Sequence, residues 1–142
     1  MRIDSFTGEY AFLSNFSSSI VELDGRYYPT VEHAYQAAKS LDKQDRAKIL
    51  LLGSTEAGKA KRLGRTFRLR PDWDDIRVDV MYTLLCQKFK RNSGLGIWLV
   101  ETGDAELIEG NHWGDTFWGV CNGIGDNMLG NLLMARRAEL EV

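Results

Sequence analysis

The sequence contains few of the residues from which metal sites and disulfide scaffolds are built. It has only two cysteines, Cys86 and Cys121, and two histidines, His33 and His112. The cysteines form neither a CxxC pair nor a zinc-ligand spacing. We therefore expect reduced thiols, no bound metal and no other cofactor.

Long apolar runs and a strong net charge are also missing. No apolar stretch approaches the roughly 20 residues needed to span a bilayer, and no signal peptide opens the chain. These absences predict a cytoplasmic protein without a membrane partner. The net charge of −2 argues against broad, nonspecific nucleic-acid binding but is compatible with a local basic patch.

The length and composition are those of an ordinary globular protein. The 142 residues suit one domain, residues 1–142, with one core. Four Trp, five Tyr and six Phe supply core side chains and, at a binding site, flat walls for sugars or bases.

Local patterns predict mostly helices and few strands. Alternation on both sides of Asp24-Gly25 predicts a hairpin within residues 19–28. Helices are expected at about residues 31–41, 43–52, 74–90 and 127–141, and the Gly- and Trp-rich residues 111–126 are expected to form a loop. The fold class is therefore α+β, a mostly helical domain with a small antiparallel sheet.

The helix expected after Pro29 carries a carboxylate, Glu32, and an amine, Lys39, seven positions later. That spacing puts them within about 20° of each other around the helix axis and about two turns apart. Both flank an apolar arc over residues 31–41, beside Tyr35 and Gln36. The pair could line a groove, but a first-turn Glu also favours the helix dipole and amphipathic helices need polar residues somewhere.

Two features could bind an anion. Arg77 and Lys88 point to the apolar face of the helix expected at residues 74–90, so they meet a buried carboxylate or line a wet cleft that holds a phosphate. "NGIGDNMLG" leads into the closing helix at Asn127, where unpaired backbone N–H groups attract anions.

Two loop-like segments carry groups suited to a nucleoside. "FLSNF" supplies Asn15 and Phe16, and an asparagine amide pairs with base edges or stabilises a turn. "NHWGDTFWG" supplies Trp113, Asp115 and Trp118. The indoles could stack on a base or ribose, or only anchor the loop, and the carboxylate could act as acid, base or hydroxyl acceptor.

A basic segment lies between the expected helices. It either receives a nucleic-acid backbone or forms a solvated surface. Its members are Lys59, Lys61, Arg62, Arg65, Arg68 and Arg70.

The order of these segments along the chain resembles the YbiA-like family, also called the NADAR domain. The resemblance rests on "FLSNF", "LDGRYYPTVEHAYQAAK", "WDDIRVDVMYTLLCQKF", "TGDAELIEGN", "DTFWG" and "GDNMLGNLLMARR", and covers about residues 5–138. It implies the YbiA-like fold and an N-glycosidase that cleaves a ribose C1–N bond. The substrate classes it implies are ADP-ribosylated guanine in DNA or RNA and a phosphorylated ribosylaminopyrimidine of riboflavin synthesis.

The resemblance also implies roles for individual residues. Lys39 would attack the ribose C1 and form a Schiff base, and Glu32 would stabilise the developing positive charge and move a proton. Asp115 would hold ribose hydroxyls or assist ring opening. The expected substrate-binding residues are Asn15, Phe16, Tyr35, Gln36, Arg77, Lys88, Trp113, Trp118 and Asn127.

Lysine attacks only when neutral, and well under about 1% of an ordinary lysine is neutral at pH 7. Here the apolar arc and the cations Arg77 and Lys88 are expected to lower the Lys39 pKa. Two rival interpretations are a module that binds ADP-ribose or a nucleotide without cleaving it and a regulatory protein with solvated charges.

Overall fold

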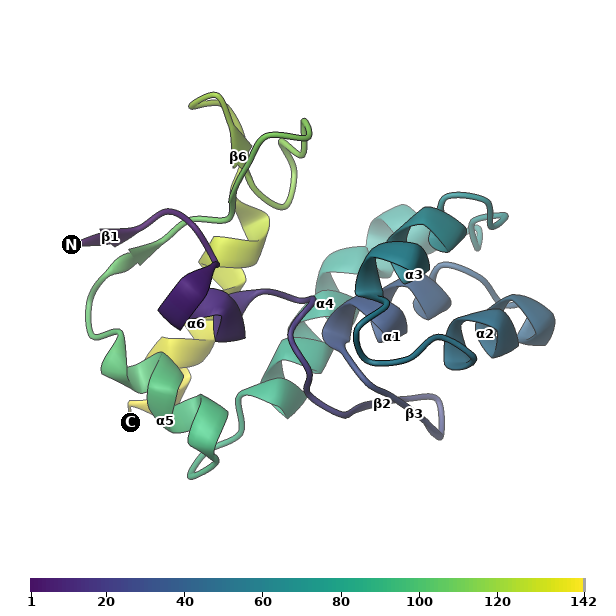
Figure 1. Cartoon of the computed structure of the whole chain (residues 1–142), viewed down its shortest axis with the longest axis horizontal. Helices are drawn as coiled ribbons and strands as arrows, with labels where there is room; N and C mark the ends of the chain where they lie inside the picture. Colours follow the sequence, from purple (N-terminus) through teal and green to yellow (C-terminus); the bar gives the residue numbers. More distant parts are fainter. Residues whose placement is uncertain (142) are drawn as a thin grey trace. The chain divides into compact units, whose positions relative to one another are not determined.

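A computed structural model describes residues 1–141, and the last residue of the predicted domain lies outside this range. The chain divides into two compact units. The first, Asn15–Lys88, is named here the α1–α4 unit. The second, Met1–Ser14 together with the chain from Phe89 onward, is the α5–α6 unit. The mixture of helices with short strands confirms the predicted fold class (Figure 1). One domain over residues 1–142 stays a prediction.

The elements are as follows. The α1–α4 unit contains β2 (Val21–Leu23), β3 (Arg26–Tyr28), α1 (Val31–Ala38), α2 (Lys43–Leu50), α3 (Ala57–Gly64) and α4 (Trp73–Lys88). The α5–α6 unit contains β1 (Arg2–Ile3), the 3-10 helix η1 (Gly8–Leu13), α5 (Gly94–Glu101), β4 (Glu106–Leu107), β5 (Gly110–Asn111), β6 (Val120–Cys121) and α6 (Met128–Leu140).

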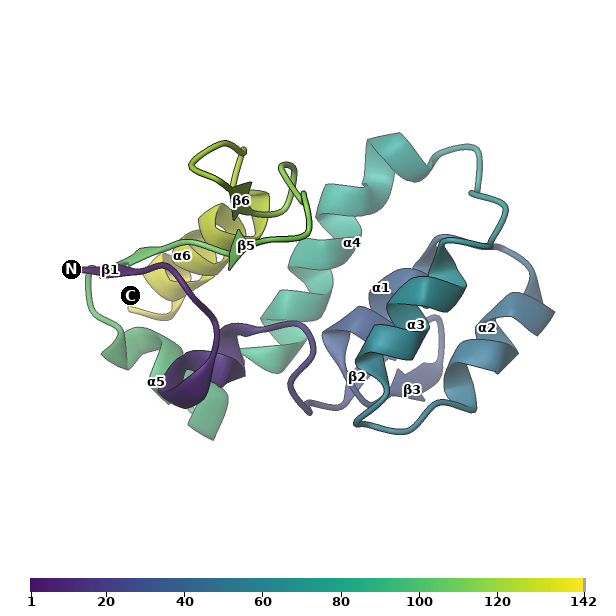
Figure 2. The ribbon, with the colours of Figure 1, turned by 45° about the horizontal axis from the view of Figure 1, so that its top comes forward.

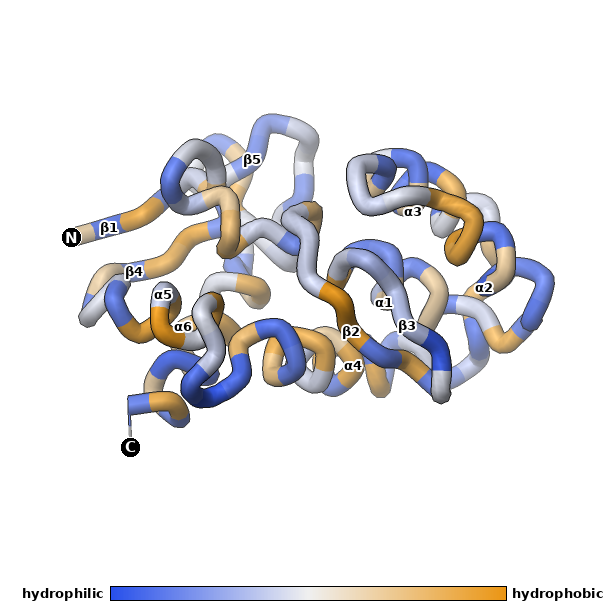
Figure 3. The backbone as a smooth tube through the Cα atoms, turned by 60° about the horizontal axis from the view of Figure 1, so that its bottom comes forward, coloured by the Kyte–Doolittle hydropathy of each residue, from blue (hydrophilic) through white to orange (hydrophobic). Residues whose placement is uncertain are grey.

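The predicted hairpin is present as the antiparallel pair β2–β3. Asp24 and Gly25 both have positive φ, 50° and 83°, as a two-residue hairpin turn of type I′ requires. Hydrophilic residues of this turn appear blue in Figure 3. The other two strand pairs, β1–β4 and β5–β6, are parallel, so the antiparallel prediction is right for the hairpin alone. Within residues 111–126 the expected loop also contains β6 and the end of β5.

A side chain of α4 pairs with the backbone of β2. The Gln87 amide nitrogen donates to the Glu22 carbonyl at 2.8 Å, and its oxygen accepts from the Glu22 N–H at 2.7 Å. The amide therefore pairs with β2 as the backbone of a third strand would, and joins the hairpin to α4.

α1 is the central helix of its unit, and every residue in it is buried. It contacts the hairpin as well as α2, α3 and α4 (Figure 2). Thr30 caps it, because its hydroxyl accepts from the His33 N–H at 3.0 Å. The helix ends at Ala38, earlier than expected, and Leu41 is 61% exposed, so its place in the apolar arc was wrong.

In the α5–α6 unit, the start of α6 is joined to β4. Asn127 has a left-handed φ of 51°. Its side-chain oxygen accepts from the Glu109 N–H at 2.9 Å, and its nitrogen donates to the Leu107 carbonyl at 2.9 Å. The amide therefore fixes residues 107–109 against the first turn of α6.

Among residues 1–141, no helix is long and apolar enough to cross a membrane. In the same range, no three His, Cys, Asp or Glu side chains are grouped so that they could hold a metal ion.

Candidate active site

The acid and the amine predicted on one helix lie at opposite ends of α1. Glu32 stands in the first turn, and Lys39 is the C-cap residue with helical φ and ψ of −61° and −27°. The Lys39 Nζ atom lies 5.7 Å from the centre of the Tyr35 ring, within cation–π range. Tyr35 is itself buried and packs against Trp73, with ring centres 5.1 Å apart.

Glu32 is only 7% exposed, and hydrogen bonds to its neighbours hold it in place. The Gln36 amide nitrogen donates to Glu32 Oε2, and the Glu32 backbone N–H donates to the Asn15 carbonyl at 3.1 Å. Gln36 is fixed from the other side by Gly64 of α3, because a Cβ atom there would overlap the Gln36 side chain. The Glu32 carboxylate is therefore oriented before any substrate binds.

The environment of Lys39 lowers the pKa of its amine. Burial lowers the Lys39 pKa, the Glu32 carboxylate raises it, and the cations Arg65 and Lys61 lower it further. The net direction is downward, as a lysine nucleophile requires. The sequence-based expectation of a lowered Lys39 pKa, caused in part by burial, was right. However, the cations that act most strongly on Lys39 belong to the α3 region and not to α4.

Two buried side-chain oxygens near Glu32 have no hydrogen-bond partner among residues 1–141. They are Asn15 Oδ1 and Gln36 Oε1. Asn15 is 8% exposed, and its amide nitrogen donates to Met81 Sδ at 3.5 Å. A buried acceptor without a donor is costly, so Asn15 Oδ1 is suited to accept a hydrogen bond from a ligand, whereas Gln36 Oε1 is packed against Gly64 of α3.

The remaining predicted residues of the α1–α4 unit differ in exposure. Phe16 is 42% exposed, and its ring lies next to the beginning of α3 at Gly58. Arg77 is half-buried. Lys88 is 3% exposed and donates to Ser17 Oγ at 2.8 Å, and burial lowers its pKa to about 7. Lys88 is therefore an interior amine.

The other predicted residues belong to the α5–α6 unit. Asp115 Oδ1 accepts from the Phe117 and Trp118 N–H groups at 3.2 and 2.9 Å, so this carboxylate shapes its loop. The Trp118 ring packs edge-on against Phe117, and Trp113 is 53% exposed. The Asn127 amide hydrogen-bonds to the backbone of Leu107 and Glu109.

Two features of the site were missed in the sequence. His33 is fully buried; we infer that its Nε2 donates to the Gly53 carbonyl at 3.1 Å while Nδ1 accepts from the Thr30 hydroxyl at 2.6 Å. The other feature is the effect of Lys61 and Arg65 on Lys39. Their spacing of four put them on one helical face, which was a usable signal.

Comparisons with known proteins identify the family and the fold of the chain. The model of the NADAR domain matches residues 4–141. The solution structure of the Escherichia coli protein YbiA superimposes with a TM-score of 0.83 at 33% identity, over 99% of this chain and 87% of that one. This likeness confirms the predicted YbiA-like fold.

Curated relatives carry two kinds of name. "N-glycosidase YbiA" of Escherichia coli is 34% identical over 139 residues, which is 97% of this chain and 86% of the relative. An N-glycosidase of Nostoc punctiforme is 38% identical over 135 residues, with coverage of 92% and 86%. A riboflavin biosynthesis protein of Vibrio vulnificus is 41% identical over 93% of this chain, which spans only 36% of that protein's length.

Proposed function

This chain belongs to the NADAR domain family, and from that premise we propose that it is an N-glycosidase that hydrolyses a ribose C1–N bond. The observation that carries the proposal is the pairing on α1 of a buried carboxylate, Glu32, with an amine, Lys39, whose pKa is lowered. A binding module needs no nucleophile. An enzyme that attacks C1 needs a neutral amine and an anionic neighbour.

The chemistry follows from the charges. As the base leaves, positive charge develops at the ribose C1, and the Glu32 carboxylate stabilises it. The Lys39 Nζ lone pair forms the new bond to C1 while the C1–N bond breaks and its electrons leave with the base, which takes up a proton. Opening of the sugar ring gives a Schiff base between C1 and Lys39, and water hydrolyses it to release the sugar and the amine.

Binding of the sugar is assigned to the groups around this pair. Gln36 orients Glu32, and the Tyr35 ring forms a wall beside the Lys39 amine. The unpartnered Asn15 Oδ1 is suited to accept from an exocyclic amine or a ribose hydroxyl. Phe16, Arg77 and Lys88 stay predicted substrate-binding residues. Asp115 stays a proposed acceptor for ribose hydroxyls, Trp113 and Trp118 stay proposed aromatic platforms, and Asn127 stays a predicted binding residue.

The proposed substrate carries phosphate. Arg62, Arg65 and Arg68 are exposed on and after α3, whereas Lys59 pairs with Glu56 at 2.8 Å and Arg70 pairs with Asp72 at 2.7 Å. The exposed arginines and the nearby Lys39 favour an anion. We therefore propose ADP-ribosylated guanine in DNA or RNA, or a phosphorylated ribosylaminopyrimidine, and the second is favoured by the riboflavin-related name of one relative.

A trapping experiment tests this function. The protein is incubated separately with an oligonucleotide containing ADP-ribosylated guanine and with a ribosylaminopyrimidine phosphate, and borohydride is added. The expected result is release of the base together with a reduced ribosyl adduct that peptide mapping places on Lys39. Lys39→Arg keeps the charge and should give no adduct.

The other outcomes are distinguishable. Release of the base without an adduct would keep the glycosidase and remove the Schiff base, leaving attack by water assisted by Glu32. Tight binding of ADP-ribose without release from either substrate would overturn the enzyme and support a binding module.

A further inference from the structure

A second group of cations surrounds a cavity of about 340 Å³ in the α1–α4 unit. The cavity is lined by the hairpin, by α2 with the residues before it, and by Arg70. Its charged and phenolic residues are Asp24, Arg26, Tyr28, Lys43, Arg46 and Arg70. The lining therefore contains four cationic side chains and one carboxylate, Asp24. Ligand pockets usually measure about 300–1,000 Å³, so this one suits a small ligand and not a dinucleotide.

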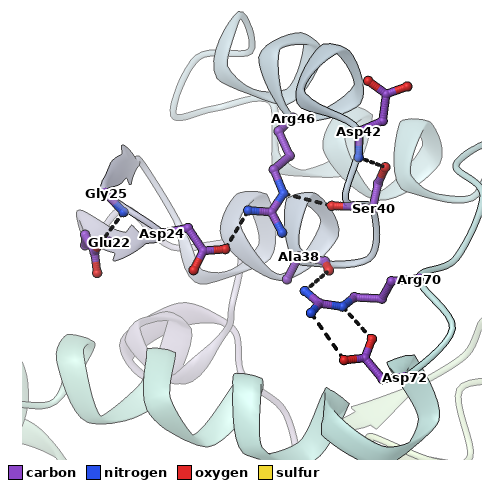
Figure 4. A network of polar contacts seen from close by, with 9 residues as sticks. All are labelled: Glu22, Asp24, Gly25, Ala38, Ser40, Asp42, Arg46, Arg70 and Asp72. Carbon is purple, nitrogen blue, oxygen red and sulfur yellow. Dashed lines mark hydrogen bonds and ion pairs between the residues drawn. The ribbon is translucent and has the colours of Figure 1, made fainter.

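Two of the guanidinium groups are fixed before a ligand arrives. Arg46 donates from Nη1 to Asp24 Oδ2 at 2.6 Å and from Nε to the Ser40 carbonyl at 2.8 Å (Figure 4). Arg70 binds both oxygens of the Asp72 carboxylate, at 2.7 and 3.3 Å. Because these contacts already restrict both guanidinium groups, binding of a ligand costs less side-chain conformational entropy.

Two buried donors in the cavity wall have no hydrogen-bond partner among residues 1–141. One is the Tyr28 hydroxyl, on a side chain that is 1% exposed, and the other is Arg46 Nη2. Burial raises the pKa of Tyr28, whereas Arg46 and Arg26 lower it and Asp24 raises it. The hydroxyl therefore lies close to the charged residues of the cavity. An anion with several oxygens could accept from both donors, which hydrophobic or cationic ligands could not do.

We propose that this cavity is a binding site for a phosphate group, held by Arg46 and the Tyr28 hydroxyl and attracted by Arg26 and Lys43. The site is separate from the Lys39 amine but touches the backbone that carries it. Arg46 holds the Ser40 carbonyl, and the Arg70 N–H donates to the Lys39 carbonyl at 2.8 Å. A phosphate that binds Arg46 would therefore also fix the backbone of Lys39 and Ser40, the two residues that follow α1.

Titration with inorganic phosphate, followed by amide NMR shifts at constant ionic strength, tests this site without reference to the proposed activity. Saturable shifts are expected in residues 24–28 and 41–50. Tyr28→Phe should weaken binding about tenfold, because a hydrogen bond to a charged ligand is lost. Lys43→Ala removes an exposed charge and should weaken it about two- to fivefold. Tyr28→Phe should still fold, since its hydroxyl has no partner among the described residues.

Lys48→Ala is the matched control, because Lys48 is an exposed lysine on the same helix that does not line the cavity. It should leave the affinity unchanged. Equal weakening by Lys43→Ala and Lys48→Ala, unchanged affinity in Tyr28→Phe, or shifts that do not saturate would each overturn the site.

A second titration with ribose 5-phosphate identifies the source of the phosphate group. A free phosphate ion is the natural ligand if both compounds bind equally and shift the same residues. If the phosphate belongs to a sugar substrate, ribose 5-phosphate should bind more tightly and also shift Tyr35 and Lys39. Both results require the same loss of affinity in Tyr28→Phe.

Discussion

Gly64 of α3 lies so close to Gln36 of α1 that a Cβ atom at this position would overlap the end of the Gln36 side chain. Gln36 in turn donates to Glu32, so one glycine on a neighbouring helix sets the position of the proposed catalytic carboxylate. The packing of α3 against α1 therefore affects the orientation of the proposed catalytic group.

Gly64→Ala should displace Gln36 and release Glu32. We expect a loss of about 1–3 kcal/mol in the free energy of unfolding, typical of overpacking. The kcat for base release should fall by up to about 100-fold, because Glu32 would be misplaced. Gly58→Ala is the control on the same helix, since a Cβ there meets its neighbours at ordinary distances of 3.7 and 3.9 Å. It should keep full activity and gain about 0.4–1 kcal/mol. Equal behaviour of the two variants would contradict the role of Gly64.

The pH dependence of base release should report the Lys39 pKa. Lys39 attacks as the neutral amine, so the rate rises as pH increases through its pKa, which lies below the usual value of 10.5. Arg65→Gln removes a positive charge that disfavours the ammonium form, so the pKa and the rising limb should move to higher pH. Arg68 is an exposed arginine outside the set of Glu32, Arg65 and Lys61 that shifts the Lys39 pKa. Arg68→Gln should therefore leave the rising limb of the pH profile in place. A shift to lower pH in Arg65→Gln would refute the assignment.

Lys88 should make stability increase with pH. Burial lowers its pKa to about 7 in the folded chain, while the unfolded value is near 10.4, so the unfolded chain binds more protons between these values. The free energy of unfolding should then rise by up to about 1.4 kcal/mol per pH unit between pH 7 and 10. Lys88→Met should flatten this dependence in urea titrations, whereas Lys90→Met, at an exposed lysine, should not. An unchanged slope in Lys88→Met would show that Lys88 stays charged in the folded state.

Substitutions of Asp115 separate its structural and chemical roles. Asp115→Ala removes the acceptor of two backbone N–H groups and should cost about 1–3 kcal/mol of stability. Asp115→Asn keeps an oxygen acceptor for the loop but removes the negative charge. If the carboxylate holds ribose hydroxyls, Asp115→Asn should retain the melting temperature and lose substrate affinity, measured as KM. Unchanged kinetics in a stable Asp115→Asn would restrict this residue to shaping the loop.

Features determined by neighbouring residues were predictable from the sequence. The Asp24-Gly25 turn follows from the preference of these residues for positive φ, and the start of α1 follows from the Thr30 hydroxyl. The side of α1 that carries Glu32 and Lys39 follows from helical periodicity. Each depends on contacts within a few positions along the chain.

Features determined by packing were not predictable from the same patterns. α1 ends at Ala38, and the Lys39 carbonyl that follows accepts from Arg70, which lies far along the sequence. The charges that lower the Lys39 pKa come from α3, and no periodicity shows which helix packs nearby. The basic segment was recognised, but only the structure shows that Lys59 and Arg70 are paired with carboxylates.

The amide of Gln87 has a consequence for the solubility of the protein. A two-stranded hairpin leaves strand edges on which strands from other chains can add, and such additions begin aggregation. On β2 the Gln87 side chain already occupies both backbone groups of Glu22, the middle residue of the strand. An incoming strand would have to displace an amide held by α4, so this edge of the hairpin is protected against the addition of further strands.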